Sequence, residues 1–593
     1  MLEERKTIEA RLSASPEVYH MARFEKAFPW LLVGGAALVL LETYRKNTND
    51  RAKANADIKA ALKNQEHQAE VLKEQIRQFD ENAFQERKAE RRERYTKAVE
   101  QLGSKEAPVR LGGVYTLVGL VDEWLEEKNL EYSEQLKEGQ VIINNLCAYI
   151  RSPFILASYY DELSEDKPSS EGIYKDNQQK FYTDKAEFTS EADIRLSIIK
   201  EIHSRLQGPD INTPGAWSDF EYDFSGSTFF YPIDLTNSYY TKPVNFSGST
   251  YQDEADFGSS IYKSWATFDG STYTGWVGFN CSTYQSWADF SASTYQDGTT
   301  FMSSTYQSWA DFSNSTCQSE VYFSDSTYKG KADFCGSTYQ NEVYFSYSTY
   351  QSEADFSDSI YQGKADFSDS TYQGWADFRN SAYQGRAGFT GSTYQSEVYF
   401  NDSTYQWAHF NCSIYRGRAD FSSSTYREGA YFTDSTYQHE VYFSGSTYED
   451  KADFSGSIFC GDVYYGKDRY NSNFSRFTDC TPQFYNENSH QNTLFGSPNN
   501  NFIVDTDKGY PINLNSEGLP LGCDFLTAEQ KEYLEDKFQE IDETKNKFLE
   551  VKDPKEKAEL SKKLQALDEK LYEWREEATT VKAEDTAPEE KNN

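Results

Sequence analysis

Large aromatic residues return at a fixed interval through the middle of the chain. From Phe224 to Phe400 an aromatic or aliphatic residue stands at every eleventh position, and after one residue is lost near Trp407 the series continues to Tyr465. A tyrosine such as Tyr295 follows most members by five residues, so each unit reads A-D-F-S-x and then S-T-Y-Q-x-x. A strict period of this kind predicts a repeat architecture in which successive units stack on one another.

The positions within each unit predict short β-strands. A small residue, Ala or Ser, stands two positions before the large one, so both point to the same side of a strand and polar residues face water. The tetrapeptide EVYF ends at Phe323 and again 22 residues later at Phe345, whereas KADF ends between them at Phe334. We therefore expect a four-sided coil of two units over residues 216–470. At about 4.8 Å per coil the rod is roughly 55 Å long, with Phe stacked on Phe and Tyr on Tyr.

The repeats KADFSDSTYQG and WADFSASTYQD resemble those of pentapeptide-repeat proteins of the eleven-residue subtype. The resemblance spans residues 219–465 and implies a mainly β fold, a right-handed quadrilateral β-helix. This chain has Ser-Thr-Tyr where family members commonly have Ala-Thr-Phe. Two orientations of the tyrosines stay open: the rings point inward with the Ser column as hydrogen-bond partner, or they lean outward at the corners.

A hydrophobic run near the N-terminus predicts a membrane anchor. After an N-terminal segment, residues 1–26, the 15 residues from Ala27 to Leu41 carry no charge, and we expect a transmembrane helix over 27–44. The run alone spans about 23 Å, so flanking residues must contribute. A buried core helix is one alternative, and a signal peptide fits poorly because no small-residue cleavage site precedes Arg45. Basic residues are more numerous after the run, which predicts a single-pass inner-membrane protein with its large C-terminal part in the cytoplasm.

Residues 45–102 lack Pro and Gly and predict one long helix. Apolar residues recur along it at alternating steps of four and three, which is typical of a coiled coil and predicts a homo-oligomer. The alternative is a single amphipathic helix packed on its own chain. The predicted oligomer seam includes Ile58, Leu62, Leu72, Ile76 and Phe79.

The rod is flanked by other predicted elements. Residues 103–210 contain apolar helical segments and form a small helical domain, and the stretch 93–117 resembles a module that often precedes pentapeptide repeats in bacterial membrane proteins. Residues 471–525 are expected to be an irregular cap over the open end of the rod. Residues 526–577 predict a helical hairpin that begins with a capping box at Thr527 and Gln530, and residues 578–593 a charged, disordered tail.

The chain is strongly acidic, with a formal charge of -36. This charge argues against direct binding to nucleic acid. The rod segment has 31 acidic and 11 basic residues. Family members that confer quinolone resistance resemble duplex DNA in shape and charge and bind topoisomerase, so a DNA-mimic regulator of a DNA-binding enzyme is one hypothesis. The favoured alternative is that the Asp before each Phe forms a solvated surface. These residues include Asp289, Asp333, Asp355 and Asp377.

Several tryptophans stand three positions before a core Phe, where we expect them to face outward. At a 22-residue coil, four of them fall in one column: Trp265, Trp287, Trp309 and Trp375. Together with the four aspartates they form the candidate partner-binding surface. Such a strip suits a protein partner or the stacking of sugar rings, and the alternative is a self-supporting ladder at a corner of the rod.

We find no sequence signal for catalysis. The eight cysteines form no CxxC pair, the six histidines share no spacing, and no phosphate-binding, dinucleotide-binding or zinc-protease motif is present. We therefore expect no enzyme activity, cofactor or metal. The leading hypothesis is a membrane-anchored scaffold that presents an acidic rod to protein partners, with a DNA mimic and a surface glycan binder as alternatives.

Overall fold

The computed structural model describes residues 51–468, 473–551 and 553–581. The chain divides into two units, Met1–Glu93 and Arg94–Asn593. Helix α3 (Arg51–Leu102) runs without a break through a stretch rich in Ala, Lys, Glu, Gln and Arg. These residues lose little side-chain freedom in a helix, and the absence of Pro and Gly leaves nothing to end it. The helix expected within residues 45–102 is therefore present from Arg51 onward.

The predicted membrane span, residues 27–44, lies outside the described residues. Among the residues that are described, no single helix is both long and apolar enough to cross a bilayer; one bent pair, Tyr132–Arg151 with Ile155–Leu163, reaches the threshold together. The first helix of that pair buries one apolar face, Ile142 and Ile143 included, in the core of the helical domain.

A small helical domain precedes the rod. Its helices are α4 (Ala107–Leu125), α5 (Tyr132–Arg151), a 3-10 turn (Ile155–Tyr159), α6 (Tyr160–Leu163) and α7 (Gln178–Leu206). Helices α5 and α7 contact the first coil at β1 (Tyr222–Asp223) and β3 (Ile233–Asp234). Their buried side chains belong to the same apolar core as the rings of the rod, so this domain closes the first end of the solenoid.

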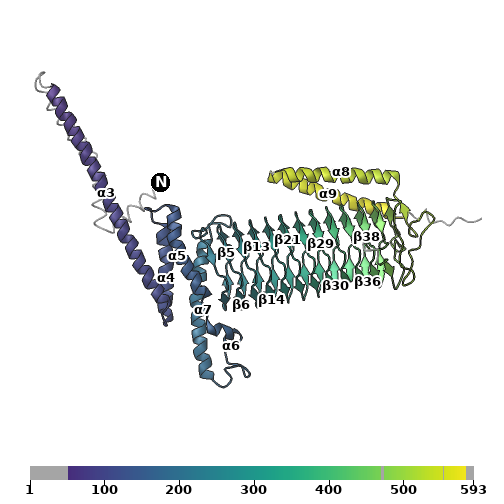
Figure 1. The fold of residues 1–593 in the computed structure, drawn as a ribbon, viewed down its shortest axis with the longest axis horizontal. Coiled ribbons are helices and arrows are strands. Elements are labelled where there is room, and N and C mark those ends of the chain that lie inside the picture. The colour runs from purple at the N-terminus through teal and green to yellow at the C-terminus, as the bar shows by residue number, and fades with distance from the viewer. Residues whose placement is uncertain (1–50, 469–472, 552, 582–593) are drawn as a thin grey trace, which may run out of the picture. The chain divides into compact units, whose positions relative to one another are not determined.

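The middle of the chain is a parallel β-solenoid of about 11 turns (Figure 1). Its strands run from β1 to β42 (Val463–Tyr464), and all are two or three residues long except β30 (Ala382–Gly388), β33 (Thr404–His409) and β36 (Thr425–Tyr431). Strand β1 pairs with β5 (Val244–Asn245), and Tyr222 stands beside Val244. In the same way β2 (Thr228–Phe229) pairs with β6 (Thr250–Tyr251), and β3 pairs with β7 (Ala255–Asp256). Strand β4 (Tyr239–Tyr240) pairs with β8 (Ile261–Tyr262). Each coil therefore contributes four strands, and the predicted 22-residue spacing is confirmed.

One coil is shorter than the others. Strands β30 and β33 pair Tyr383 with Tyr405 but Arg386 with Trp407, so one residue is missing between these pairs. Three residues on, Phe389 still stacks on Phe410, with ring centroids 4.9 Å apart. The deletion predicted near Trp407 is thus absorbed at the surface of the rod while the core keeps its register.

Four columns of rings fill the rod. Two consist almost entirely of phenylalanine, with Phe334 stacked on Phe312 and on Phe356 at 4.9 Å. The other two consist mainly of tyrosine, as in Tyr284 on Tyr306 at 4.9 Å. The rings of all four columns are buried, which decides between the two orientations left open for the tyrosines: they point inward. Edge-to-face contacts between columns complete a packing that aromatic rings favour.

Serines two positions before the tyrosines form hydrogen-bonded columns between coils. The backbone N–H of Ser337 donates to Ser359 Oγ at 3.1 Å, and Ser359 Oγ donates to the carbonyl oxygen of Phe334 at 3.3 Å. These hydroxyls therefore satisfy the backbone rather than serving mainly the tyrosines. Among the described residues, the buried hydroxyls of Tyr251 and Tyr448 have no hydrogen-bond partner.

The segment after Tyr465 extends the columns before it closes them. Short strands β43 (Arg476–Phe477), β46 (Leu494–Phe495) and β47 (Asp524–Phe525) add to the rod, and β44 (Tyr485–Asn486) pairs antiparallel with β45 (Gln491–Asn492). Phe477 stacks on the last tyrosine of its column at 4.7 Å. Irregular loops with strands of this kind cover the end that would otherwise pair with another molecule.

The C-terminal helices lie along the side of the last coils (Figure 1). They are α8 (Ala528–Glu550), with the predicted capping box at Thr527 and Gln530, and α9 (Pro554–Thr579). The two helices form the predicted hairpin, and its apolar face packs on the rod in a cluster of Ile458, Leu494, Leu526, Leu534, Phe538, Ile541, Leu567 and Leu571. Two ion pairs flank the cluster: Arg416 with Asp568, and Arg575 with Asp434.

Candidate functional site

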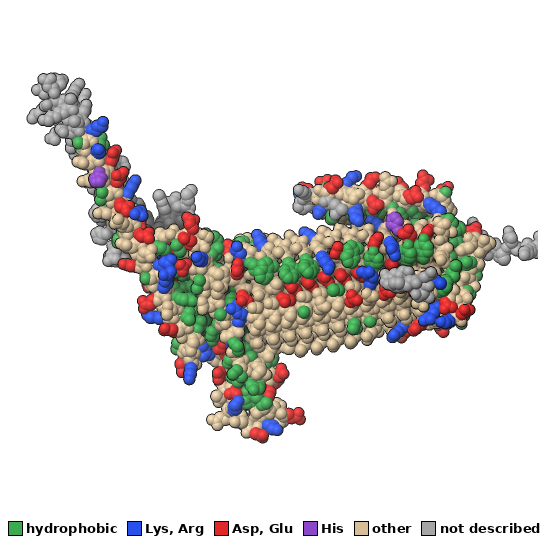
Figure 2. Space-filling view, viewed as in Figure 1, with side chains coloured by type: hydrophobic (Ala, Val, Ile, Leu, Met, Phe, Trp, Pro, Cys, Tyr) green, Lys and Arg blue, Asp and Glu red, His purple; other side chains and the backbone are tan. Residues whose placement is uncertain are grey.

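The predicted tryptophan column lies on the twelve-stranded sheet that runs the length of the rod. Trp265, Trp287 and Trp309 precede β9 (Ala266–Thr267), β13 (Ala288–Asp289) and β17 (Ala310–Asp311), and between 36% and 43% of each residue is exposed. The rings of Trp287 and Trp309 stack with centroids 5.7 Å apart. In Figure 2, hydrophobic side chains follow this length of the rod beside a row of acidic ones.

Trp375 lies in the same column but apart from the other three. The two coils between Trp309 and Trp375 hold Lys331 and Glu353 at the equivalent position. The ammonium of Lys331 lies 5.9 Å from the centre of the Trp309 ring, which gives the end of the strip a cation–π contact. The structure therefore brings three of the four predicted tryptophans together.

The aspartates beside this column are not the solvated surface that we predicted. Asp289, Asp333 and Asp377 are buried, with 8%, 7% and 2% of each residue exposed, and Asp355 is partly buried. The backbone N–H and hydroxyl of Ser291 donate to Asp289 Oδ1 at 3.0 and 2.7 Å. Each carboxylate thus turns back to accept from the residue two positions on, as Asp does in tight turns. Alternation along a strand predicted the outward position but not this return to the backbone.

Burial affects the pKa of three aspartates in this column. Desolvation raises the pKa of Asp289, Asp311 and Asp355 above the usual value, and the hydrogen bonds from the following serines oppose the shift. A group that binds its proton more tightly in the folded state makes folding sensitive to pH.

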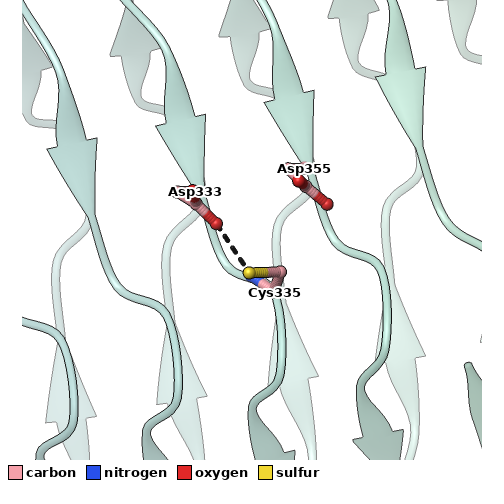
Figure 3. A group of neighbouring side chains, drawn as sticks. All are labelled: Asp333, Cys335 and Asp355. Carbon is pink, nitrogen blue, oxygen red and sulfur yellow. Dashed lines mark hydrogen bonds between the residues drawn. The ribbon is translucent and has the colours of Figure 1, made fainter.

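Asp333, Cys335 and Asp355 form a compact group on neighbouring coils (Figure 3). Their potential ligand atoms lie within 4.8 Å of one another. Burial and the nearby Asp333 raise the pKa of the Cys335 thiol to about 12, so the thiol keeps its proton and donates to that carboxylate. The ammonium of Lys331 lies 2.6 Å from Asp333 Oδ2. Because metals bind the thiolate rather than the thiol, we interpret this group as part of the aspartate column.

The predicted oligomer seam lies on α3. Leu62, Leu72, Ile76 and Phe79 are exposed on this helix, whereas the side chain of Ile58 lies outside the described residues. Exposed apolar residues at steps of four and three, as from Leu72 to Ile76 to Phe79, suit a partner helix. The coiled coil stays a prediction.

A groove that we did not predict from the sequence lies farther along the same sheet. It has a volume of about 330 Å³ and crosses five successive coils near the C-terminal end of the rod. Its lining residues are Arg379, Tyr399, Asn401, Arg418, Asp420, Ser422, Tyr442, Ser444, Tyr464, Gly466, Lys467 and Asn501. The sequence does contain a signal for this groove. Nearly all of its lining residues stand at two or three positions of the 22-residue repeat, and earlier coils mostly hold Asp or Ser at these positions.

Comparison with known proteins does not identify the chain. No family model, curated protein or solved structure matches the sequence or the fold.

Proposed function

We propose that the chain is a membrane-anchored interaction scaffold of pentapeptide-repeat type. Its rod would be a right-handed quadrilateral β-helix, anchored through residues 27–44 and oligomerised through α3, with the rod in the cytoplasm. The function needs a stiff surface more than a catalytic centre. Stacked rings and backbone pairing between coils supply that stiffness over about 53 Å, taken as eleven spacings of about 4.8 Å.

The exposed tryptophan strip is the observation that carries this proposal. Large aromatic side chains dominate binding energy at protein interfaces, and Trp is among the residues most enriched there. A single exposed Trp needs no explanation, but Trp265, Trp287 and Trp309 occupy one column on three successive coils. Other coils place Lys331 or Glu353 at this position, so the fold does not require an aromatic residue there.

The buried aspartates favour a scaffold over a DNA mimic. A mimic must expose carboxylates in the manner of phosphates, yet Asp289 and Asp333 are buried and accept hydrogen bonds from their own turns. Lys331 further neutralises Asp333. The acidic rod is therefore less similar to a duplex than its formal charge suggests.

Photo-crosslinking in native membranes tests the scaffold. A photoreactive residue at Gln285, which is exposed after the tyrosine of its unit, would report proteins held near the rod. We expect a discrete partner whose crosslink is lost in Trp287→Glu/Trp309→Glu and kept in Trp407→Glu, which changes a tryptophan on another strand column. Both variants carry a residue that other coils already hold. The absence of any discrete crosslink, or equal loss in both variants, would refute this function.

The thiol of Cys281 tests the cytoplasmic placement, because this cysteine is exposed. We expect an impermeant thiol reagent to label it only after the cells are lysed. Rapid labelling in intact cells would place the rod outside.

A further inference from the structure

The groove arises where the repeat changes its surface residues. It begins beside β29 (Ala376–Asp377) and ends beside β42. In earlier coils of this sheet, the second strand residue is usually Asp, whose carboxylate accepts from the backbone two positions on, as Asp311 accepts from Ser313 at 3.0 Å. Tyr399, Tyr442 and Tyr464 occupy that position in the groove. A tyrosine hydroxyl cannot accept this hydrogen bond from the backbone, so each replacement removes a contact that stabilises the turn. Stability of the turn therefore does not explain these tyrosines.

Three cationic side chains line the groove. Arg379 and Arg418 lie over the rings of Tyr399 and Tyr442, at 5.0 and 4.3 Å from the ring centres. Each guanidinium also pairs with an aspartate of its own coil. Lys467 is the third cationic side chain of the lining, and it forms no ion pair among the described residues. Carboxylates beside the groove also bind its lining, because Glu397 and Asp462 accept hydrogen bonds from lining tyrosines.

Asn401 supplies a buried acceptor without a partner. Only 3% of the residue is exposed, and its amide nitrogen donates to Asp402 Oδ2 at 2.7 Å. Among the described residues, its Oδ1 atom accepts no hydrogen bond, although the residue lines the groove. The next two coils hold Ser422 and Ser444 at this position, so the fold does not require an amide. An unsatisfied buried acceptor is costly, and a hydroxyl from a ligand would satisfy it.

We propose that this groove binds an acidic oligosaccharide, a short chain of sugar rings that carries carboxylates. A hydroxyl of one ring would donate to Asn401, and the carboxylate of another ring would pair with Lys467, three coils farther along the rod. The C–H faces of the rings would pack on the tyrosine side chains. A volume of about 330 Å³ is in the range of small-ligand sites. One lining cation without an ion pair among the described residues, Lys467, matches one carboxylate better than the near-double charge of a phosphate monoester.

Calorimetric titration of the full chain in detergent micelles tests this site. The probe is a linear tetrasaccharide of glucuronate, compared with a neutral glucose tetrasaccharide, inorganic phosphate and adenosine monophosphate. We expect saturable binding of the glucuronate probe alone. The variants Asn401→Ser and Tyr442→Asp restore residues that other coils carry and are expected to fold. Each should weaken binding about tenfold, the effect of one lost contact.

The control is Tyr344→Asp, which makes the same change in the same tetrapeptide, EVYF, on another strand column. It should bind the glucuronate probe as the unaltered chain does. The proposal fails if the glucuronate probe does not bind saturably, if the neutral sugar binds as tightly, or if Tyr344→Asp weakens binding equally. Preferential binding of phosphate or adenosine monophosphate would assign the groove to a different ligand and equally overturn it. These outcomes are independent of the crosslinks that test the scaffold.

Discussion

Arg416 joins the helical hairpin to the rod and offers a test of how the two are held together. Most units have Gln at this position, directly after the tyrosine. Arg416 is 5% exposed and pairs with Asp568 of α9. Arg427 occupies the same position one unit later and is exposed. The variants Arg416→Gln and Arg427→Gln therefore make one chemical change at two equivalent positions, and among the described residues only the first forms an ion pair with the hairpin.

The variant Arg416→Gln leaves the carboxylate of Asp568 without its ion-pair partner. Asp568 would keep its place against the rod without the guanidinium, but 26% of its side chain is exposed, so water retains part of its hydration. Burial already raises the pKa of Asp568, and Arg416 opposes that shift. Leaving such a group unpaired costs about 2 kcal/mol, which is about a 30-fold change in the equilibrium between docked and undocked hairpin. The apolar cluster around Phe538 remains intact and should keep the docked state dominant.

Amide hydrogen exchange in α8 and α9 measures this equilibrium in the full chain. We expect exchange about 30-fold faster in Arg416→Gln and unchanged in Arg427→Gln. Arg416→Gln/Asp568→Asn should recover part of the protection, because the uncompensated carboxylate is gone. Unchanged exchange in Arg416→Gln, or equal acceleration in both single variants, would refute a role for this ion pair in docking.

Three further predictions concern the stability of the rod. Phe334→Ala removes a ring stacked on both axial neighbours and should lower the free energy of unfolding in urea by about 4 kcal/mol, whereas a loss below about 1 kcal/mol would argue against a packed ring column. Tyr347 has a φ of 58°, a conformation that disfavours side chains, so Tyr347→Gly should stabilise the protein by about 1 kcal/mol in the same assay; destabilisation would contradict the proposed strain. Because burial raises the pKa of Asp289, Asp311 and Asp355, the folded state binds more protons between the usual Asp value and the raised values, and stability should fall as pH rises through that window. Replacing all three by Asn should flatten this slope, and an unchanged slope would exclude them as its source.

The periodic part of the fold was predictable because every unit repeats the same local rule. The spacing of Phe and Tyr determines which residues share a face, and stacking one coil on the next then sets the strand register. The inward tyrosines were harder to predict, since a phenol in a core normally needs a partner, and the Tyr251 hydroxyl has none in the described part of the chain. No local pattern distinguishes that arrangement from an outward ring.

The functional surface was predictable only in part. The outward tryptophans follow from the period, but the direction of each Asp carboxylate depends on a side-chain torsion that the period does not determine. The groove depends on departures from the repeat in five coils, and on Asn501 from beyond the rod. The docking of the hairpin depends on single charged residues, Arg416 and Arg575, whose partners lie more than a hundred positions away in the sequence.

Distances between spin labels on the rod test the coil-on-coil arrangement most directly. The spin labels are attached to a ketone-bearing amino acid that replaces Gln285 and Gln373, so that the native cysteines stay unlabelled. These two positions are four coils apart in the same column, and the labels should lie about 19 Å apart. Moving the second label to Gln395 should add about 5 Å. Pulsed electron paramagnetic resonance would measure both distances. Growth by one strand spacing for each 22 residues is the predicted result, and distances that do not grow in this way would contradict the stacked solenoid on which the proposed surfaces depend.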